Sequence, residues 1–185
     1  MKAKVCLVGE ATVGKSSLIR RFVFDQFSDA YVATLGAKVV ARDIVVPSDA
    51  GDIGVKMMIW DIIGETSLLE AYGNEYFVNV QGIVAVCDLT RYSTFERIPI
   101  WLDAVRRVAG DVPKVIAVNK VDLRGEVLVL YDEYGVQQYA NEVGARWYLT
   151  SARTGENVAA MFQALASDVV ARARRTVPAR DPPAS

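Results

Sequence analysis

Short apolar runs rich in β-branched residues alternate along this chain with longer stretches of helical periodicity. The short runs predict six strands, at residues 4–8, 38–46, 55–60, 82–88, 114–119 and 146–149. Apolar positions that recur every three or four residues predict helices at 15–24, 68–76, 98–108, 134–143 and 157–174. This alternation favours an α/β fold with three layers, in which helices cover both faces of a mostly parallel six-stranded sheet.

The stretch from Pro47 to Gly54 lies between two predicted strands and is rich in turn residues. Such a stretch is typical of a hairpin, so the second strand is expected to be antiparallel, at an edge of the sheet. We expect residues 1–175 to form one domain. Residues 176–185, which are polar and rich in Pro, are expected to form a flexible tail.

Composition narrows the choice of partners. Of the 185 residues, 52% are apolar and 23% are charged, as in ordinary globular proteins. The net charge of −1 predicts no general attraction to nucleic acid or to an anionic membrane. Cys6 and Cys87 lie in apolar runs of a chain without histidine, which favours buried thiols over a metal site and fits a cytoplasmic setting.

A phosphate-binding motif follows the first predicted strand directly and precedes a predicted helix. Its residues match the pattern G-x-x-x-x-G-K-[ST]: Gly9, Glu10, Ala11, Thr12, Val13, Gly14, Lys15 and Ser16. Backbone N–H groups of such a loop converge on phosphates, and the following helix directs its positive end at them. Lys15 is expected to bind the β- and γ-phosphates, Ser16 to ligate Mg²⁺, and Ser17 to extend the same site.

A second motif, Asn119-Lys120-Val121-Asp122, follows the strand predicted at 114–119. Asp122 can accept hydrogen bonds from the N1–H and the exocyclic amine of guanine. Adenine offers no such pair of donors, so a carboxylate facing it would be left unpaired. The rest of the predicted base site is Leu123, Ser151, Ala152 and Arg153, with the Ala152 N–H directed at the guanine O6 and the Lys120 stem covering the ring.

These motifs, together with Trp60-Asp61-x-x-Gly64 and Tyr31-x-x-Thr34-x-Gly36, resemble the Ras superfamily and its Rab branch in particular. The resemblance covers about residues 3–173 and includes the runs Asp88-Leu89-Thr90 and Trp101-Leu102. It implies the Ras-like P-loop NTPase fold. It also implies a molecular switch that binds GTP or GDP with Mg²⁺ and hydrolyses GTP.

The same resemblance assigns roles to two switch segments. The first contains Tyr31 and Thr34, and the second contains Asp61 and Gly64. Thr34 and Asp61 would join Ser16 as Mg²⁺ ligands, while Phe27 would lie against the guanine and Tyr31 over the phosphates. The catalytic set it implies is Glu65, Gly64, Lys15 and Thr34. Protein effectors, an exchange factor and an activating protein are expected to bind near residues 31–40 and 61–77.

The second switch departs from the family pattern Asp-Thr-Ala-Gly-Gln at two catalytic positions, because this chain has Asp61-Ile62-Ile63-Gly64-Glu65. In the family, the glutamine at the last of these positions orients the attacking water. An ionised Glu65 instead adds negative charge next to the γ-phosphate oxygens, on which negative charge builds in the transition state. The β-branched Ile63 restricts the backbone that must approach the γ-phosphate. We therefore expect slow intrinsic hydrolysis, and a hydrolysis-deficient GTP-binding scaffold stays open as an alternative. A P-loop ATPase or kinase is a further alternative, which the base-reading motif disfavours.

Two expected absences bear on partners. Arg20 and Arg21 fall on the helix after the P-loop and head away from it, so an activating protein is expected to supply any catalytic arginine. The last residues contain no cysteine for prenylation and residue 2 is Lys, so no lipid anchor is expected. The protein would act in the cytoplasm or be brought to a membrane by a partner. These features also fit a non-eukaryotic Rab-like protein.

Overall fold

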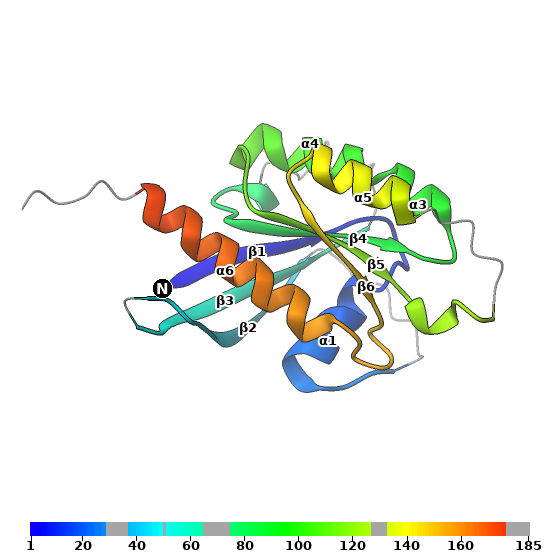
Figure 1. Ribbon diagram of the computed structural model, residues 1–185, viewed down its shortest axis with the longest axis horizontal. Coiled ribbons are helices and arrows are strands. Elements are labelled where there is room, and N and C mark those ends of the chain that lie inside the picture. Colours follow the sequence, from blue (N-terminus) through cyan, green and yellow to red (C-terminus); the bar gives the residue numbers. More distant parts are fainter. Residues whose placement is uncertain (29–36, 50, 65–74, 127–132, 177–185) are drawn as a thin grey trace, which may run out of the picture.

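The computed structural model describes residues 1–28, 37–49, 51–64, 75–126 and 133–176 (Figure 1). Its strands are β1 (Lys2–Val8), β2 (Ala37–Val46), β3 (Ile53–Ile62), β4 (Gly82–Asp88), β5 (Lys114–Asn119) and β6 (Arg146–Thr150). They form one sheet in the order β2-β3-β1-β4-β5-β6. Only β2 runs antiparallel to its neighbour, at the edge of this described sheet. The predicted hairpin and the antiparallel edge strand are therefore confirmed.

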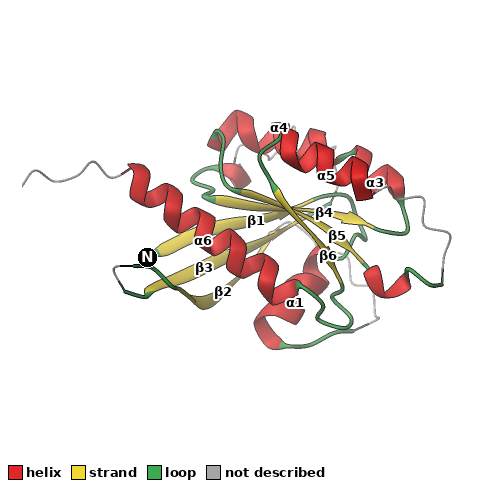
Figure 2. Ribbon diagram, in the orientation of Figure 1, coloured by secondary structure: helices red, strands yellow, loops and turns green. Residues whose placement is uncertain are grey.

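Helices cover both faces of this sheet (Figure 2). The helices are α1 (Lys15–Phe24), α3 (Tyr92–Glu96), α4 (Ile98–Ala109), α5 (Glu133–Glu142) and α6 (Val158–Thr176). Helices α1 and α6 lie on one face, while α3, α4 and α5 lie on the other. The three predicted layers are confirmed. Helix α3 and a 3₁₀ turn at Val121–Leu123 were not predicted, and the helix predicted at 68–76 lies mostly outside the described residues.

Successive side chains of each buried strand point to opposite faces, and this alternation builds two cores. From β1, Val5 and Leu7 pack on the side of α1 and α6, where the rings of Phe22 and Phe162 stack with centroids 4.0 Å apart. Cys6 and Val8 pack on the other side, beneath the fully buried Trp101 of α4 and its neighbours.

Both cysteines are buried and neither forms a disulfide, as the sequence predicts. Burial raises the pKa of the Cys6 thiol to about 12, against a smaller opposing effect of Lys4. A thiol with so high a pKa carries almost no thiolate at neutral pH, so Cys6 is chemically inert there.

Helix α6 continues through Thr176, two residues beyond the helix end predicted at 174, and residues 177–185 lie outside the described part of the chain. Within the described residues, no helix is both long enough and apolar enough to cross a bilayer. Because β1, β3, β4, β5 and β6 are parallel, their carboxyl ends meet at one edge of the sheet. Open α/β sheets bind ligands at such an edge.

Candidate functional site

The phosphate-binding motif, residues 9–16, spans the loop after β1 and the first two residues of α1, and its two glycines adopt a backbone that side chains rarely accommodate. Gly9 has φ 137° and Gly14 has φ 101°, both in a region that side chains rarely adopt. A Cβ on Gly9 would lie 2.1 Å from the Val86 carbonyl oxygen, and one on Gly14 would lie 2.3 Å from Asn119 Nδ2. The loop therefore wraps closely against β4 and β5.

Gly9→Ala should lower the free energy of unfolding by at least about 2 kcal/mol, because the methyl group both strains the backbone and overlaps Val86. Urea denaturation monitored by tryptophan fluorescence measures this loss. Gly54→Ala is the matched control, since no atom lies within 4 Å of a Cβ built there. Equal stability of the two variants would contradict the close packing of the loop.

Lys15 begins α1 and folds back into the loop. Its side chain is buried, and its Nζ donates hydrogen bonds to the carbonyl oxygens of Gly9 at 2.7 Å and Glu10 at 2.8 Å. Burial lowers the pKa of Lys15 to about 8, while the charges of Asp61 and Glu10 act in the opposite direction. A desolvated ammonium group next to the positive end of α1 favours an anion in this loop.

Ser16 and Asp61 place two hard oxygen ligands side by side. The Ser16 hydroxyl, in the first turn of α1, donates to Asp61 Oδ2 at 2.5 Å, and Asp61 is buried near the end of β3. A hydroxyl and a carboxylate suit Mg²⁺, which usually takes its other ligands from phosphates and water. Within the described residues, no group of three or more Asp, Glu, His and Cys side chains is placed to hold a metal ion. The donor set thus fits a metal shared with a phosphate ligand.

The start of the predicted second switch lies directly on the phosphate-binding loop. A Cβ on Gly64 would be 2.5 Å from both the Ala11 nitrogen and Lys15 Nζ, so only glycine fits there without displacement. Ile63 is partly buried and packs against the core beneath α4, which anchors this segment. Glu65, Thr34 and Tyr31 lie outside the described residues.

Asn119, at the end of β5, connects the phosphate-binding loop to the end of β6 and the loop that follows it. Its Nδ2 donates to the Val13 carbonyl at 2.9 Å, and its Oδ1 accepts from Thr150 Oγ1 at 3.3 Å and from the Ala152 N–H at 3.2 Å. The Ala152 N–H, which the sequence assigned to the guanine O6, thus donates to Asn119 in this structure. The cause is the carboxamide of Asn119, which faces both loops from the buried strand end.

The predicted base-reading residues do come together. Asp122 Oδ1 accepts a hydrogen bond from the buried Ser151 hydroxyl at 2.6 Å, which orients the carboxylate. Arg21 of α1 holds the loop after β6 by donating to the carbonyl oxygens of Ala152 at 2.9 Å and Arg153 at 2.6 Å. Helix α1 thus contacts both predicted halves of the site, the phosphate-binding motif and the base-reading residues.

The remaining predicted residues have less specific environments. Leu123 lies in the 3₁₀ turn and is half-buried, and Ser17 is half-buried on α1. Phe27 is partly buried against the core on the α1 side. Lys120 adopts a left-handed backbone with φ 69°, and its Nζ donates to Asp88. The Glu10 carboxylate accepts from Trp101 Nε1 at 3.2 Å.

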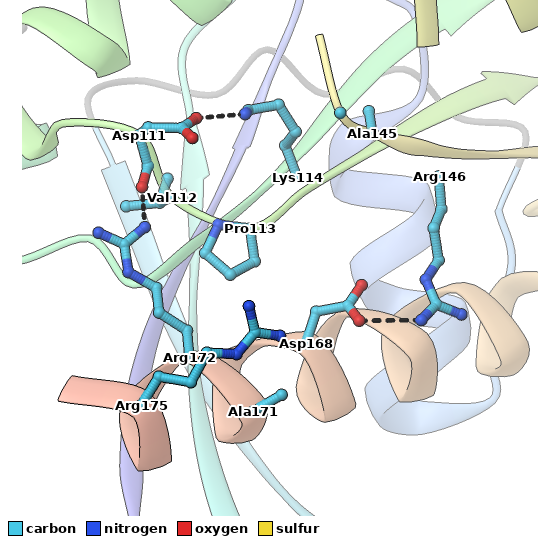
Figure 3. A pocket seen from close by; sticks show the side chains of 11 residues that line it. Asp111, Val112, Pro113, Lys114, Ala145, Arg146, Asp168, Ala171, Arg172 and Arg175 are labelled. Carbon is cyan, nitrogen blue, oxygen red and sulfur yellow. Dashed lines mark hydrogen bonds and ion pairs between the residues drawn. The ribbon is translucent and has the colours of Figure 1, made fainter. Parts of the chain in front are cut away.

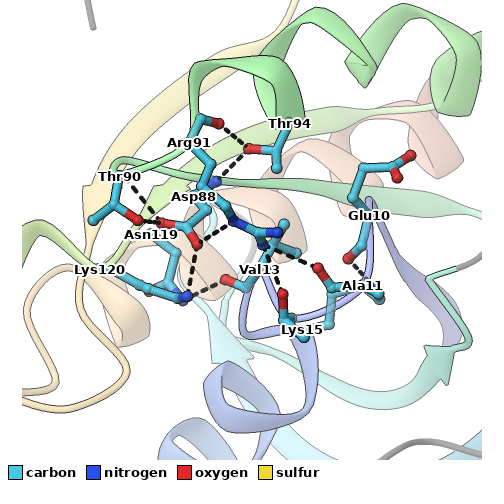
Figure 4. Close-up of polar contacts among 11 residues, drawn as sticks. Glu10, Ala11, Val13, Lys15, Asp88, Thr90, Arg91, Thr94, Asn119 and Lys120 are labelled. Atoms are coloured by element: carbon cyan, nitrogen blue, oxygen red, sulfur yellow. Dashed lines mark hydrogen bonds and ion pairs between the residues drawn. The ribbon is translucent and has the colours of Figure 1, made fainter. Parts of the chain in front are cut away.

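Two residues of this site, Asp88 and Arg91, were not predicted from the sequence. Asp88 ends β4 and is fully buried, and Arg91 lies three residues further on (Figure 4). Arg91 donates to the Ala11 carbonyl and the Thr12 hydroxyl of the phosphate-binding loop, whereas Arg20 and Arg21, which the sequence places near this loop, lie on α1. The available signal was the polar run that ends a strand adjacent to β1 and β5 in the sheet.

A cavity of about 530 Å³ lies away from these residues, beside the amino ends of β5 and β6 and the last turns of α6 (Figure 3). Two ion pairs line it, Lys114 with Asp111 at 2.5 Å and Arg146 with Asp168 at 2.9 Å. It contains none of the motif residues, whereas the carboxyl edge of the sheet gathers both motifs. We therefore place the functional site at that edge.

Comparison with known proteins identifies the family of this chain. The model of the Ras family matches residues 4–171. The chain is 34% identical to Ras-related protein Rab-21 of Geodia cydonium, over 92% of this chain and 72% of that protein. It is 34% identical to GTP-binding protein yptV2 of Volvox carteri, over 91% of this chain and 76% of the relative. It is 30% identical to Ras-related protein Rab-13 of Mesocricetus auratus, over 90% of this chain and 79% of that protein. The chain therefore belongs to the Ras family, within which its sequence is Rab-like.

Proposed function

We propose that this protein is a guanine-nucleotide switch that binds GTP and GDP with Mg²⁺ and hydrolyses GTP to change its affinity for partner proteins. The observation that carries this proposal is the Asn119 side chain, which joins a phosphate-binding loop holding Lys15 to a base-reading loop holding Asp122. Phosphate and guanine recognition are thereby built into one connected unit. Titration of the nucleotide-free protein with GDP and with ADP tests the proposal.

At the phosphate end, Lys15 and the backbone N–H groups of residues 9–16 would hold the β- and γ-phosphates. Ser16 and Asp61 would hold Mg²⁺, with Thr34 as a further ligand, and the metal would neutralise charge on the phosphates. The neighbouring Gly64 gives the second switch a point of contact with this end of the site.

Switching would follow from the contact between the start of the second switch and the phosphate end of the site. Gly64 lies against Ala11 and Lys15, so groups that bind the third phosphate also contact the second switch. Loss of that phosphate would remove these contacts and release the loop, as in other order–disorder switches. Effectors, an exchange factor and an activating protein would bind residues 31–40 and 61–77 in one of these two states. The two buried cysteines, which form no disulfide, fit a cytoplasmic setting.

Hydrolysis by the isolated protein is expected to be slow, and Glu65→Gln should accelerate it. An amide can donate a hydrogen bond to the developing anion, which an ionised carboxylate cannot do, so we expect a gain of at least about tenfold in single-turnover rate. Quantifying GDP formed from pre-bound GTP over time gives both rates. The exposed Glu133→Gln is the control and should leave the rate unchanged.

The two proposals for this site diverge in that experiment. Slow but measurable turnover that rises in Glu65→Gln supports the switch. No turnover in either protein would favour the alternative, a GTP-binding scaffold. Natural turnover that already equals the Glu65→Gln rate would contradict our interpretation of the second switch.

A further inference from the structure

Arg91 crosses from the turn after β4 to the phosphate-binding loop (Figure 4). Its Nη2 donates to the carbonyl oxygen of Ala11 at 3.0 Å and to the Thr12 hydroxyl at 2.8 Å, across about 80 residues of sequence. The side chain is 42% exposed, so it reaches the loop from the solvent side. Arginine suits such a bridge because its planar fork offers several donors in fixed directions.

The buried Asp88 carboxylate anchors the other end of this fork. Arg91 Nε donates to Asp88 Oδ2 at 3.0 Å, and Lys120 Nζ donates to the same oxygen at 2.6 Å. The second oxygen accepts from the N–H and the hydroxyl of Thr90. Burial alone would raise the pKa of Asp88, but the hydrogen bonds from Lys120 and Thr90 outweigh it and lower that pKa. Asp88 thus stays ionised and holds both cations.

The backbone of Arg91 is held in place by hydrogen bonds within the turn after β4. The Arg91 N–H donates to the Asp88 carbonyl at 2.9 Å, and the Arg91 carbonyl accepts from the Thr94 hydroxyl at 2.7 Å. Arg91 is also the N-cap residue of α3. The guanidinium group is therefore positioned by a preformed turn, which limits the entropy lost in holding the loop.

The contact with Ala11 controls the direction of a neighbouring N–H group. A trans peptide places its C=O and N–H on opposite sides, so a carbonyl held by Arg91 turns the Thr12 N–H away from Arg91. Thr12 has φ 63°, a conformation that a residue with a side chain keeps only when its surroundings impose it. Asn119 holds the Val13 carbonyl in the same way from the β5 side.

We propose that Arg91 is a positioning residue that holds the phosphate-binding loop in its nucleotide-binding conformation and, through Asp88, couples this loop to Lys120 of the base-reading loop. The inference rests on the proposed nucleotide-binding function. Arg91 acts through the Ala11 carbonyl and the Thr12 hydroxyl of the phosphate-binding loop, and its expected effect is on how long a nucleotide stays bound.

Arg91→Ala should release bound GDP about tenfold faster, because it removes charge-assisted hydrogen bonds that are partly exposed to solvent. Displacement of a fluorescent GDP by excess GDP gives the dissociation rate. Arg91→Lys should not restore the natural rate, since one ammonium group cannot reach Asp88 and the loop together. Arg20→Ala is the control: it removes an exposed arginine of α1 and should leave the rate unchanged.

A double-mutant cycle with Thr12→Ala separates positioning from simple stabilisation of the turn. If Arg91 acts on the loop, the effects of Arg91→Ala and Thr12→Ala on GDP dissociation are not additive, whereas a role confined to the turn makes them additive. Natural GDP dissociation in Arg91→Ala, full rescue by Arg91→Lys, or additivity in the cycle would each overturn the inference. Failure of the natural protein to bind GDP would instead overturn the proposed function.

Discussion

Asp122→Asn should lower the affinity for GDP by about 10³-fold or more and should allow the protein to bind xanthosine diphosphate. The carboxylate can accept both the N1–H and the exocyclic amine of guanine, while an amide places a donor against one of them. Xanthine carries a carbonyl where guanine carries the amine, so it pairs with the new amide. Ser151 holds Asp122 in place at 2.6 Å, and an amide can keep that hydrogen bond.

Competition of guanosine and xanthosine diphosphates against a fluorescent nucleotide measures both affinities in the natural protein and in the variant. Asp49→Asn, in the exposed hairpin turn, makes the same chemical change away from the site and should alter neither affinity. Unchanged GDP affinity in Asp122→Asn, with xanthosine diphosphate still excluded, would show that another residue reads the base.

Lys15→Ala should weaken GDP and GTP binding by about 10²-fold or more, and GTP binding more than GDP binding. The ammonium group is buried inside the loop, where its interaction with phosphate is stronger than in water. GTP brings a further phosphate to the same cation, which explains the expected difference. The substitution leaves the Gly9 and Glu10 carbonyl oxygens without this donor.

Equilibrium titration with fluorescent GDP and GTP quantifies this loss. Lys56→Ala removes an exposed lysine of β3 and should bind both nucleotides like the natural protein. Circular dichroism should show both variants folded, so that the loss can be assigned to the site. Full GTP affinity in a folded Lys15→Ala protein would contradict the role of residues 9–16.

Local patterns were enough to predict most of the fold. The bounds of β4, β5 and α1 were predicted to the residue, because apolar runs end where polar, site-forming residues begin. Helix α3 was missed because five residues, Tyr92–Glu96, are too short to show a helical period. The predicted helix at 68–76 stays a prediction.

The candidate site was predictable where a motif is contiguous in sequence and not where contacts join distant segments. The loop of residues 9–16 carries its own pattern, and so does Asn119-Lys120-Val121-Asp122. Arg91 belongs to no such motif, because its contact with the phosphate-binding loop depends on the strand order that places β4 beside β1. The hydrogen bond from Ala152 to Asn119 was likewise beyond local patterns, since it depends on how β5 and β6 align.

Guanine recognition is the central claim, and calorimetric titration of the nucleotide-free protein with GDP and with ADP, each in the presence of Mg²⁺, tests it most directly. Sites that hydrogen-bond a distinguishing group reject the analogue that lacks it by about 10⁴-fold or more, so we expect GDP to bind and ADP to give no measurable heat at the same concentrations. Binding of ADP as tight as or tighter than that of GDP would contradict the account.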